Sequence, residues 1–230
     1  MGLLSKKNKP SQKAYAVVTG AGSGIGRSFA LELAKRGGDV ICADIEFSSA
    51  QETVDLIQSM TSTSAYAVHC DVGLKESVHA LAEQAEQLLG HPVTLLINNA
   101  GVGLGGKFDE VPLEDWQWCM HVNLWGVIHG CHYFVPKFKQ QGFGAISNVA
   151  TAAGYTAAPE MTAYNVTKSS VLALSETLAS ELHTYNIAVN VLCPTLVPTN
   201  IMKNGRLPSR YSGLADKLLM NHAFTTSDAV

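Results

Sequence analysis

Charge is scarce in this sequence, and little of it is concentrated in one place. Lys, Arg, Asp and Glu together make up 15% of the 230 residues, and the formal net charge is −3. The one basic cluster lies within residues 6–13, in a polar leader that we interpret as solvated. Proteins that bind nucleic acids usually concentrate positive charge on one face. No nucleic-acid partner is therefore expected.

Long apolar runs are missing as well. The sequence has no stretch of about 20 apolar residues, the length that spans a bilayer as a helix. Its N-terminus also lacks the apolar core of a signal peptide. We therefore expect no membrane span.

The cysteines do not form a pattern of pairs. There are five, an odd number, and no Cys-x-x-Cys occurs. Cys42, Cys70 and Cys193 lie in apolar strand-like runs, where a thiol behaves as a small buried hydrophobe. Free thiols of this kind are typical of a reducing compartment, so we expect a cytoplasmic protein. His129 and His132 are three residues apart, but no third ligand has recognisable spacing, and no metal site is expected.

Short apolar runs alternate with helical patterns along most of the chain. Apolar, β-branched runs occupy residues 14–19, 40–43, 65–70, 93–97, 145–149 and 187–192, and helical patterns occupy 27–36, 49–60, 75–89, 113–139 and 163–185. Strands that are apolar throughout and separated by helices predict a parallel sheet covered on both faces. The expected fold class is α/β, a single domain with a doubly wound parallel sheet that binds ligands beyond the carboxyl ends of its strands.

A glycine-rich turn follows the first expected strand. Gly20, Gly22, Gly24 and Gly26 stand directly before a helical pattern, with the spacing Gly-x-x-x-Gly-x-Gly read from Gly20. Glycine allows a tight turn and lets the backbone approach a pyrophosphate, to which the amides at the start of the helix can donate. A flexible turn without a ligand is the alternative interpretation.

Asp44 ends the second expected strand, 20 residues after Gly24. A carboxylate at this point can accept hydrogen bonds from ribose hydroxyls and repels a 2′-phosphate. No Arg or Lys occurs at residues 45–50, and Ser23 occupies the glycine-rich turn. These features favour NAD over NADP as the cofactor, although Asp44 is also compatible with a turn or capping role.

Tyr164 and Lys168 are four residues apart at the start of a long helical pattern. Residues at this spacing share one face of a helix. A phenol with a pKa near 10 is a poor base at neutral pH, but a neighbouring ammonium favours its charged form. The pair is therefore a candidate for acid–base chemistry, and a surface pair is the alternative.

Together these segments resemble the short-chain dehydrogenase/reductase (SDR) family. The resemblance extends over residues 13–199 and rests on motifs in family order: residues 19–26, Asp71–Val72, 98–101, Asn123 and 164–168. It implies a Rossmann fold of about seven strands, a nicotinamide cofactor and three parts of the chain. These are a polar tail (1–12), a dinucleotide-binding catalytic domain (13–199) and a substrate-loop or lid segment (200–230).

The resemblance also assigns roles to individual residues. The catalytic group consists of Asn123, Thr151, Tyr164 and Lys168, with Asn123 holding a relay water and Lys168 also binding the nicotinamide ribose. The implied cofactor contacts are Gly20, Ser23, Gly24, Ile25, Gly26, Asp44, Ile45, Asp71, Val72, Asn98, Ala100, Gly101, Tyr164, Lys168, Pro194, Val197 and Thr199.

The chain departs from the family pattern at three points. Thr151 replaces a serine thirteen residues before the tyrosine; it keeps the hydroxyl but adds a methyl group, while Ser147 is too far along the strand to substitute. Thr195 replaces a glycine after the last strand, which would strain the loop if the glycine's backbone conformation is demanding. The third departure is length, because relatives usually continue beyond residue 230.

The expected substrate region is largely apolar. Its members are Val102, Leu104, Phe108, Tyr155, Pro159, Met161, Ile201, Met202 and Leu207. We therefore expect an NAD-dependent oxidoreductase that interconverts a hydrophobic alcohol and its ketone or aldehyde, with Tyr164 as the acid–base group. A non-catalytic or truncated dinucleotide-binding protein and an NADP-dependent carbonyl reductase remain alternatives. Small residues along the 163–185 helix make a homodimer or homotetramer reasonable.

Overall fold

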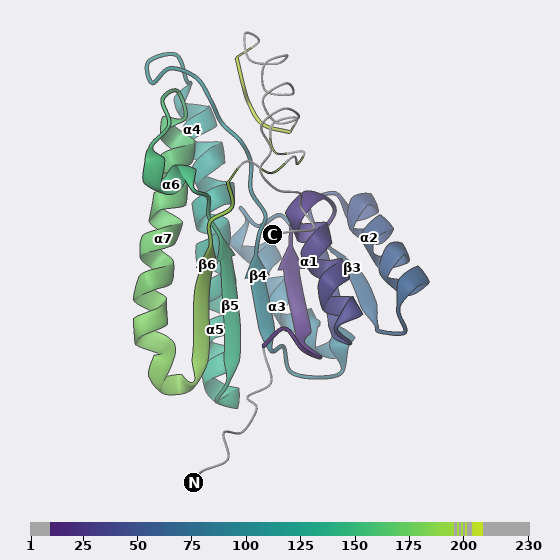
Figure 1. Ribbon diagram of the computed structural model, residues 1–230. Helices are drawn as coiled ribbons and strands as arrows, with labels where there is room; N and C mark the ends of the chain where they lie inside the picture. Colours follow the sequence, from purple (N-terminus) through teal and green to yellow (C-terminus); the bar gives the residue numbers. More distant parts are fainter. Residues whose placement is uncertain (1–9, 196, 198, 200, 202–203, 209–230) are drawn as a thin grey trace.

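The protein forms one six-stranded parallel sheet with helices on both faces (Figure 1). The computed structural model describes residues 10–195, 197, 199, 201 and 204–208. The strands are β1 (Tyr15–Thr19), β2 (Asp39–Asp44), β3 (Ala65–His69), β4 (Leu95–Asn98), β5 (Gly144–Val149) and β6 (Ile187–Leu192). The helices are α1 (Gly24–Lys35), α2 (Phe47–Met60), α3 (Lys75–Leu89), α4 (Leu113–Met120), α5 (Gly126–Gln141), α6 (Ala153–Thr156) and α7 (Thr162–Leu182).

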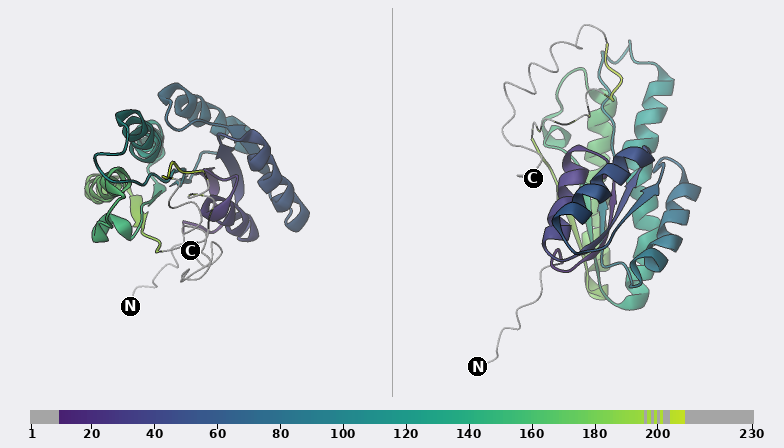
Figure 2. Two further views of the ribbon diagram at one scale, coloured as in Figure 1. Left: turned by 90° about the horizontal axis from the view of Figure 1, so that it is seen from above. Right: turned by 90° about the vertical axis from the view of Figure 1, so that its right-hand side faces the viewer.

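The strand order creates a crevice at the middle of the sheet. The order is β3-β2-β1-β4-β5-β6, so the chain builds outward from β1 in one direction and then returns to build outward from β4 in the other. Helices α7 and α2 consequently lie at opposite ends of the sheet (Figure 1 and Figure 2). In open α/β sheets, ligands bind beyond the strand ends where the order reverses. Here that point lies between β1 and β4.

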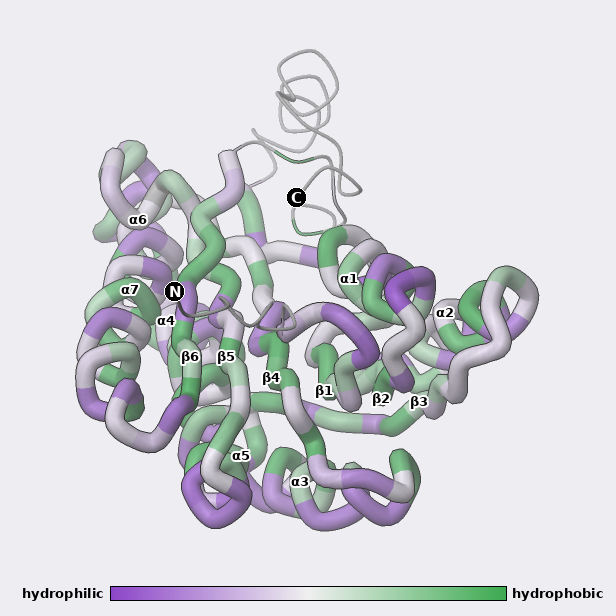
Figure 3. The backbone as a smooth tube through the Cα atoms, turned by 60° about the horizontal axis from the view of Figure 1, so that its bottom comes forward, coloured by the Kyte–Doolittle hydropathy of each residue, from purple (hydrophilic) through white to green (hydrophobic). Residues whose placement is uncertain are grey.

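Alternate residues of each strand pack into two separate cores. Val17 and Ile41 belong to the core under α3, α5 and α7, whereas Val18 and Cys42 belong to the core under α1 and α2. Figure 3 shows the row of apolar strands with α1 and α2 on one side and α3 and α5 on the other. Because both faces of the central strands are covered, their sequences are mostly apolar and do not alternate with polar residues. The predicted fold class is confirmed.

The helix expected at 113–139 is interrupted. A π-helical turn at His121–Trp125 separates α4 from α5, and Asn123 lies inside this turn with no exposed surface. Single π turns inside α-helices occur often at functional sites. The apolar periodicity continues through the turn, which is why the sequence predicts one uninterrupted helix.

The resemblance implies about seven strands, and the described residues form six. Residues 209–230, most of the expected lid segment, lie outside the described residues. Among the helices that the structure describes, none combines the length and the apolar character needed to cross a bilayer.

Gly130 provides a test of the packing between α5 and β4. A Cβ atom at this position would lie 2.1 Å from Asn98 Oδ1, inside the buried core. We expect Gly130→Ala to lower the free energy of unfolding by about 1–3 kcal/mol, because the added methyl group displaces a packed side chain. Urea denaturation measures the change, and Gln140→Ala, at an exposed position of the same helix, is the control. Equal stability of the two variants would contradict the packing described here.

Candidate active site

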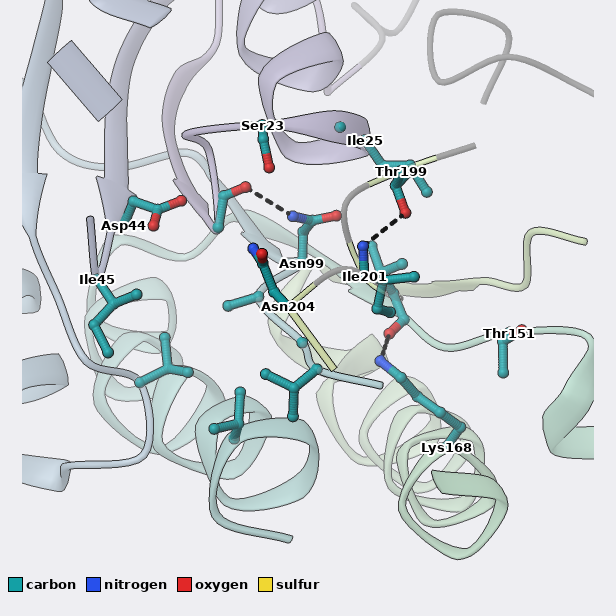
Figure 4. A pocket seen from close by; sticks show the side chains of 18 of the residues that line it. Ser23, Ile25, Asp44, Ile45, Asn99, Thr151, Lys168, Thr199, Ile201 and Asn204 are labelled. Atoms are coloured by element: carbon teal, nitrogen blue, oxygen red, sulfur yellow. Dashed lines mark hydrogen bonds between the residues drawn. The ribbon is translucent and has the colours of Figure 1, made fainter. Parts of the chain in front are cut away.

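A cavity of about 530 Å³ opens at the carboxyl ends of the strands. Figure 4 shows Asp44 and Ile45 on one side of it, and Thr151 and Lys168 on the other. The residues singled out from the sequence that line it are Gly20, Ser23, Gly24, Ile25, Asp44, Ile45, Asp71, Val72, Ala100, Gly101, Thr151, Tyr164, Lys168, Pro194, Val197 and Thr199. Its volume is in the ordinary range for ligand and cofactor sites. Three other predicted site residues, Gly26, Asn98 and Asn123, do not line it.

The glycine-rich turn requires glycine at specific positions. Gly20 and Gly24 have φ angles of +65° and +51°, in the left-handed region that favours glycine. A Cβ atom at Gly26 would lie 2.1 Å from the Gly20 carbonyl oxygen, so any side chain there would push the first turn of α1 off the loop. Gly26 thus shapes the turn from behind, while Gly20 and Gly24 border the cavity. The turn leaves the amino end of α1 beside the cavity, which is the arrangement that binds phosphate.

The far end of the cavity from Lys168 is acidic. Asp44 Oδ2 accepts a hydrogen bond from the Gly22 amide at 2.8 Å, and Oδ1 accepts one from the Glu46 amide at 3.0 Å. Glu46 also lines the cavity, a contact that the sequence analysis missed although Glu46 lies two residues after Asp44. Lys168 is the one Lys or Arg among the described lining residues.

The turn after β4 places Asn99, and not Asn98, at the cavity. Asn98 is buried in the core, where its Nδ2 donates to Asn148 Oδ1 at 2.9 Å, so the assignment of Asn98 to the cavity wall is not met. Asn99 lines the cavity, and its Nδ2 donates to the carbonyl oxygens of Thr19 and Gly20. Strand alternation explains the difference. The side chains of Leu96 and Asn98 point to the same core, so Asn99, the next residue, is the one whose side chain reaches the cavity.

Tyr164 is 8% exposed at the cavity wall. Burial raises the pKa of its phenol to about 12, and a side-chain hydrogen bond with Thr151 partly opposes the shift by lowering the pKa. The net direction is opposite to the depressed pKa that a neighbouring ammonium was expected to produce, because loss of solvent outweighs the favourable contacts. The Lys168 Nζ atom lies 5.9 Å from the centre of the Tyr164 ring.

Lys168 is also buried, at 3% exposure. Its Nζ donates to the Val149 carbonyl oxygen at 2.9 Å, which holds α7 against the end of β5 (Figure 4). Burial lowers the pKa of this ammonium to about 8, since the charged form loses its hydration. The cavity wall therefore holds two buried side chains that can carry a proton.

Asn123 supports the cavity from behind. Its Oδ1 accepts from the Val102 amide at 2.8 Å, and its Nδ2 donates to the Val102 carbonyl oxygen at 2.9 Å. Gly101 lies directly in front, where a Cβ atom would be 3.2 Å from Asn123 Oδ1 and 3.4 Å from Lys168 Nζ. The absence of a side chain at Gly101 therefore leaves room for a ligand beside the lysine.

The structure shows the surroundings of two residues that depart from the family pattern, Thr151 and Thr195. Thr151 lines the cavity and its hydroxyl donates to the Pro194 carbonyl oxygen at 3.3 Å, whereas Ser147 bonds to Asn190 and does not line the cavity. Thr195 also lines the cavity and is not among the described residues with positive φ. Its backbone therefore does not occupy the left-handed region, and the strain considered from the sequence does not arise there.

The expected substrate residues separate into several groups. Val102 and Ile201 line the cavity, Leu104 is buried behind it, and Phe108 and Tyr155 are 70% and 67% exposed. Pro159 is exposed, Met161 and Leu207 are half-buried and do not line the cavity, and Met202 lies outside the described residues.

Trp118, Val122 and Asn204 line the cavity and were missed by the sequence analysis. Trp118 and Val122 belong to α4 and the π-helical turn, four residues apart and so on one helix face. That spacing is equally compatible with ordinary core packing. Sequence alone gives no signal that this face meets the cavity.

Comparison with known proteins agrees with this geometry. The family model of short chain dehydrogenases matches residues 14–208. The chain belongs to the short-chain dehydrogenase family.

Individual SDR proteins are similar over most of the chain. "Probable oxidoreductase EphD" of Mycobacterium tuberculosis is 35% identical over 186 residues, which are 80% of this chain and 31% of that protein. The "7alpha-hydroxysteroid dehydrogenase" of Escherichia coli K12 is 32% identical over 82% of this chain and 73% of its own length. A solved SDR structure from Burkholderia phymatum in complex with NAD has a TM-score of 0.88 at 34% identity, covering 96% of this chain and 83% of that one. The chain thus spans about a third of EphD and most of the other two.

The lowered pKa of Lys168 predicts a pH-dependent stability. Between pH 8 and 10.5 the unfolded chain holds the Lys168 proton and the folded chain does not, so this group increases stability as pH rises. We expect the free energy of unfolding of wild type, relative to Lys168→Met, to rise by the order of 3 kcal/mol across that range.

Urea denaturation of both proteins at several pH values measures this difference. Because the other titrating groups are common to both proteins, their contributions cancel in the comparison. Lys35→Met, at an exposed position, controls for the loss of a lysine. A wild-type-minus-Lys168→Met difference that stays constant with pH would show that Lys168 is not desolvated.

Proposed function

We propose that this chain is an NAD-dependent oxidoreductase that interconverts a hydrophobic primary or secondary alcohol and its aldehyde or ketone. The carrying observation is one cavity with Tyr164, Thr151 and Lys168 at one end and Asp44 at the other. A dinucleotide cofactor has matching chemistry, with a reactive ring at one end and an adenosine ribose at the other.

The residues present fit such a cofactor. Gly20 and Gly24 remove side chains where a pyrophosphate would approach, and Gly101 leaves space beside Lys168. Asp44 and Glu46 supply carboxylates for ribose hydroxyls and disfavour a 2′-phosphate. When bound, the nicotinamide ring supplies the hydride acceptor or donor. The NAD-bound relative supports this assignment.

The protein's own contribution is proton transfer and orientation. In the oxidising direction, Tyr164 accepts the proton of the substrate hydroxyl, and the Thr151 hydroxyl donates a hydrogen bond to the same oxygen. Because burial raises the pKa of Tyr164, the base form must be stabilised by positive charge in the loaded site. Lys168 can supply part of that charge below about pH 8, where its ammonium form persists.

The reactive end of the cavity favours an apolar substrate. Val102, Trp118, Val122 and Ile201 form its apolar wall, and Asn204 adds a single amide. Among the described residues no Arg lines the cavity, and the guanidinium of Arg206, which stacks on the Trp118 ring at 4.2 Å, pairs with Asp115, so a carboxylate or phosphate on the substrate would find no free guanidinium in this wall. The similarity to a hydroxysteroid dehydrogenase supports a bulky hydrophobic alcohol.

A homodimer or homotetramer is also proposed. Helix α7 exposes Val166 together with the small residues Ser169, Ala173 and Ser180 on its outer side. Small exposed residues let two helices approach closely, which supports self-association through this helix.

Tyr164→Phe tests the proposed base. We expect turnover to fall by about 10²–10⁴-fold, the usual contribution of a positioned acid–base group, while NADH affinity stays within about twofold. Steady-state kinetics with NAD and a panel of hydrophobic alcohols, together with calorimetric NADH titration, measure the two effects. Tyr185→Phe, in an exposed tyrosine at the opposite end of α7, is the control. Retention of most activity by Tyr164→Phe would remove Tyr164 from the mechanism.

Thr151 variants test the hydroxyl that stands in place of serine. Thr151→Ser should keep or increase the turnover number, since the donor remains and the methyl group is lost. Thr151→Val keeps the side-chain shape and removes the hydroxyl, and both it and Thr151→Ala should lose about 10²-fold. Full activity in Thr151→Val would show that the hydroxyl plays no part. NADH binding without turnover in wild type would favour the non-catalytic alternative.

A further inference from the structure

The acidic end of the cavity has a second layer behind it. Gly22 is held through both of its backbone polar groups: its amide donates to Asp44 Oδ2 at 2.8 Å, and its carbonyl oxygen accepts from the guanidinium of Arg27. A Cβ atom at Gly22 would lie 2.8 Å from Asp44 Oδ2 and 2.7 Å from Ser49 Cβ. Asp44, Ser49 and the Gly22 backbone thus meet at one point, and Arg27 reaches it from α1.

Arg27 is held there by α2. Its Nη2 lies 3.0 Å from Glu52 Oε2 and 3.4 Å from the Ser49 carbonyl oxygen. Its Nε donates to Thr53 Oγ1 at 2.9 Å, and Thr53 in turn donates to the Ala21 carbonyl oxygen at 2.8 Å. The side chains of Arg27 and Glu52 are 28% and 66% exposed, so water reaches the pair. Arg27 does not line the cavity.

This arrangement matters for the choice of cofactor. A guanidinium is the side chain best matched to a phosphate, because its planar set of donors binds two phosphate oxygens together. Arg27 and Asp44 both bond to the backbone of Gly22, and an arginine this near to a carboxylate that would bind the ribose would ordinarily favour NADP. Glu52 balances the charge of Arg27 and accepts from its Nη2, while Thr53 accepts from its Nε.

We infer that Glu52 is a specificity-determining residue, which keeps Arg27 engaged and thereby excludes a 2′-phosphate from the ribose end of the cavity. The inference rests on the proposed NAD preference and extends it beyond Asp44. Asp44 repels the phosphate directly, whereas Glu52 removes the cation that would otherwise attract it. When Asp44 alone is replaced, Arg27 stays paired with Glu52, so we expect only part of the gain in NADPH affinity.

Binding of NADH and NADPH to the full chain, measured by calorimetry without substrate, tests the inference. Wild type should bind NADH more tightly than NADPH, and Asp44→Ser should reduce the ratio of the two affinities. Adding Glu52→Gln to Asp44→Ser should strengthen NADPH binding by about fivefold with NADH affinity within about twofold. The fivefold gain should shrink at about 0.5 M NaCl, as expected for a charge effect between partly exposed groups. A merely structural role of Glu52 would alter both cofactors alike and independently of salt.

Two further variants assign the gain to Arg27. Arg27→Gln in the Asp44→Ser/Glu52→Gln background should abolish it, and Arg27→Lys should keep part of it. Circular dichroism verifies that each variant is folded. Glu32→Gln is the matched control, because it breaks the 2.8 Å pair between Glu32 and Arg36 at the C-terminal end of α1, away from the cavity, and should leave both affinities unchanged.

The outcomes separate this inference from the proposed function. Wild-type preference for NADPH would overturn the NAD assignment itself. If wild type prefers NADH but Glu52→Gln does not change the affinity for NADPH in the Asp44→Ser background, the NAD assignment stays intact and the role of Glu52 is overturned. A gain that survives Arg27→Gln would show that Glu52 acts only by its own charge, which would overturn the role of Arg27.

Discussion

A set of hydrogen bonds between the ends of β1 and β4 shapes the rest of the site. The Thr19 hydroxyl accepts from the amides of Asn99 and Ala100 at 3.0 and 3.1 Å, while Asn99 Nδ2 donates back to the carbonyl oxygens of Thr19 and Gly20. A Cβ atom at Gly20 would lie 2.8 Å from Ala100 Cα, so the two turns are too close for a side chain at this position. Because the sheet reverses its order between these strands, this contact sets the width of the crevice in which a cofactor can lie.

At the end of the cavity that holds Tyr164 and Lys168, burial disfavours the charged forms of both side chains. Tyr164 and Lys168 both lose solvent, which raises the pKa of the phenol and lowers that of the ammonium. Each shift favours the neutral form, so the phenol stays protonated at neutral pH, whereas Lys168 keeps its ammonium form until the pH approaches its pKa of about 8. The Val149 carbonyl oxygen and the Asn123–Val102 hydrogen bonds keep the surrounding backbone in place. At neutral pH the site therefore holds a neutral phenol and a largely charged ammonium in fixed positions.

The two ends of the cavity differ in charge, and in the proposed function this difference would orient the dinucleotide. Asp44 and Glu46 stand at one end and Lys168 at the other, with the glycine-rich turn between them. Arg27 would disturb this arrangement if it faced the cavity, and its ion pair with Glu52 turns it instead toward α2. If Glu52 acts as we infer, the choice between NAD and NADP depends on a contact between α1 and α2 as well as on the strand end.

What the sequence determined by itself is local in origin. The apolar runs define the strands because both faces of the sheet are covered, and the positive φ angles of Gly20 and Gly24 favour glycine. Tyr164 and Lys168 share a face because they are four residues apart on one helix. Each of these features requires only near neighbours in the chain, so residue type and spacing suffice to predict it.

The tertiary structure alone decided the features that join distant segments. Strand alternation at the end of β4 places Asn99 at the cavity and buries Asn98, and the packing of α4 against α7 accompanies the position of Trp118 at the cavity wall. The π-helical turn around Asn123 depends on its bonds to Val102, 21 residues away. The shifted pKa values of Tyr164 and Lys168 follow from burial, which depends on everything packed around them. These properties arise from solvent exclusion and long-range contacts, and neither is encoded in the spacing of neighbouring residues.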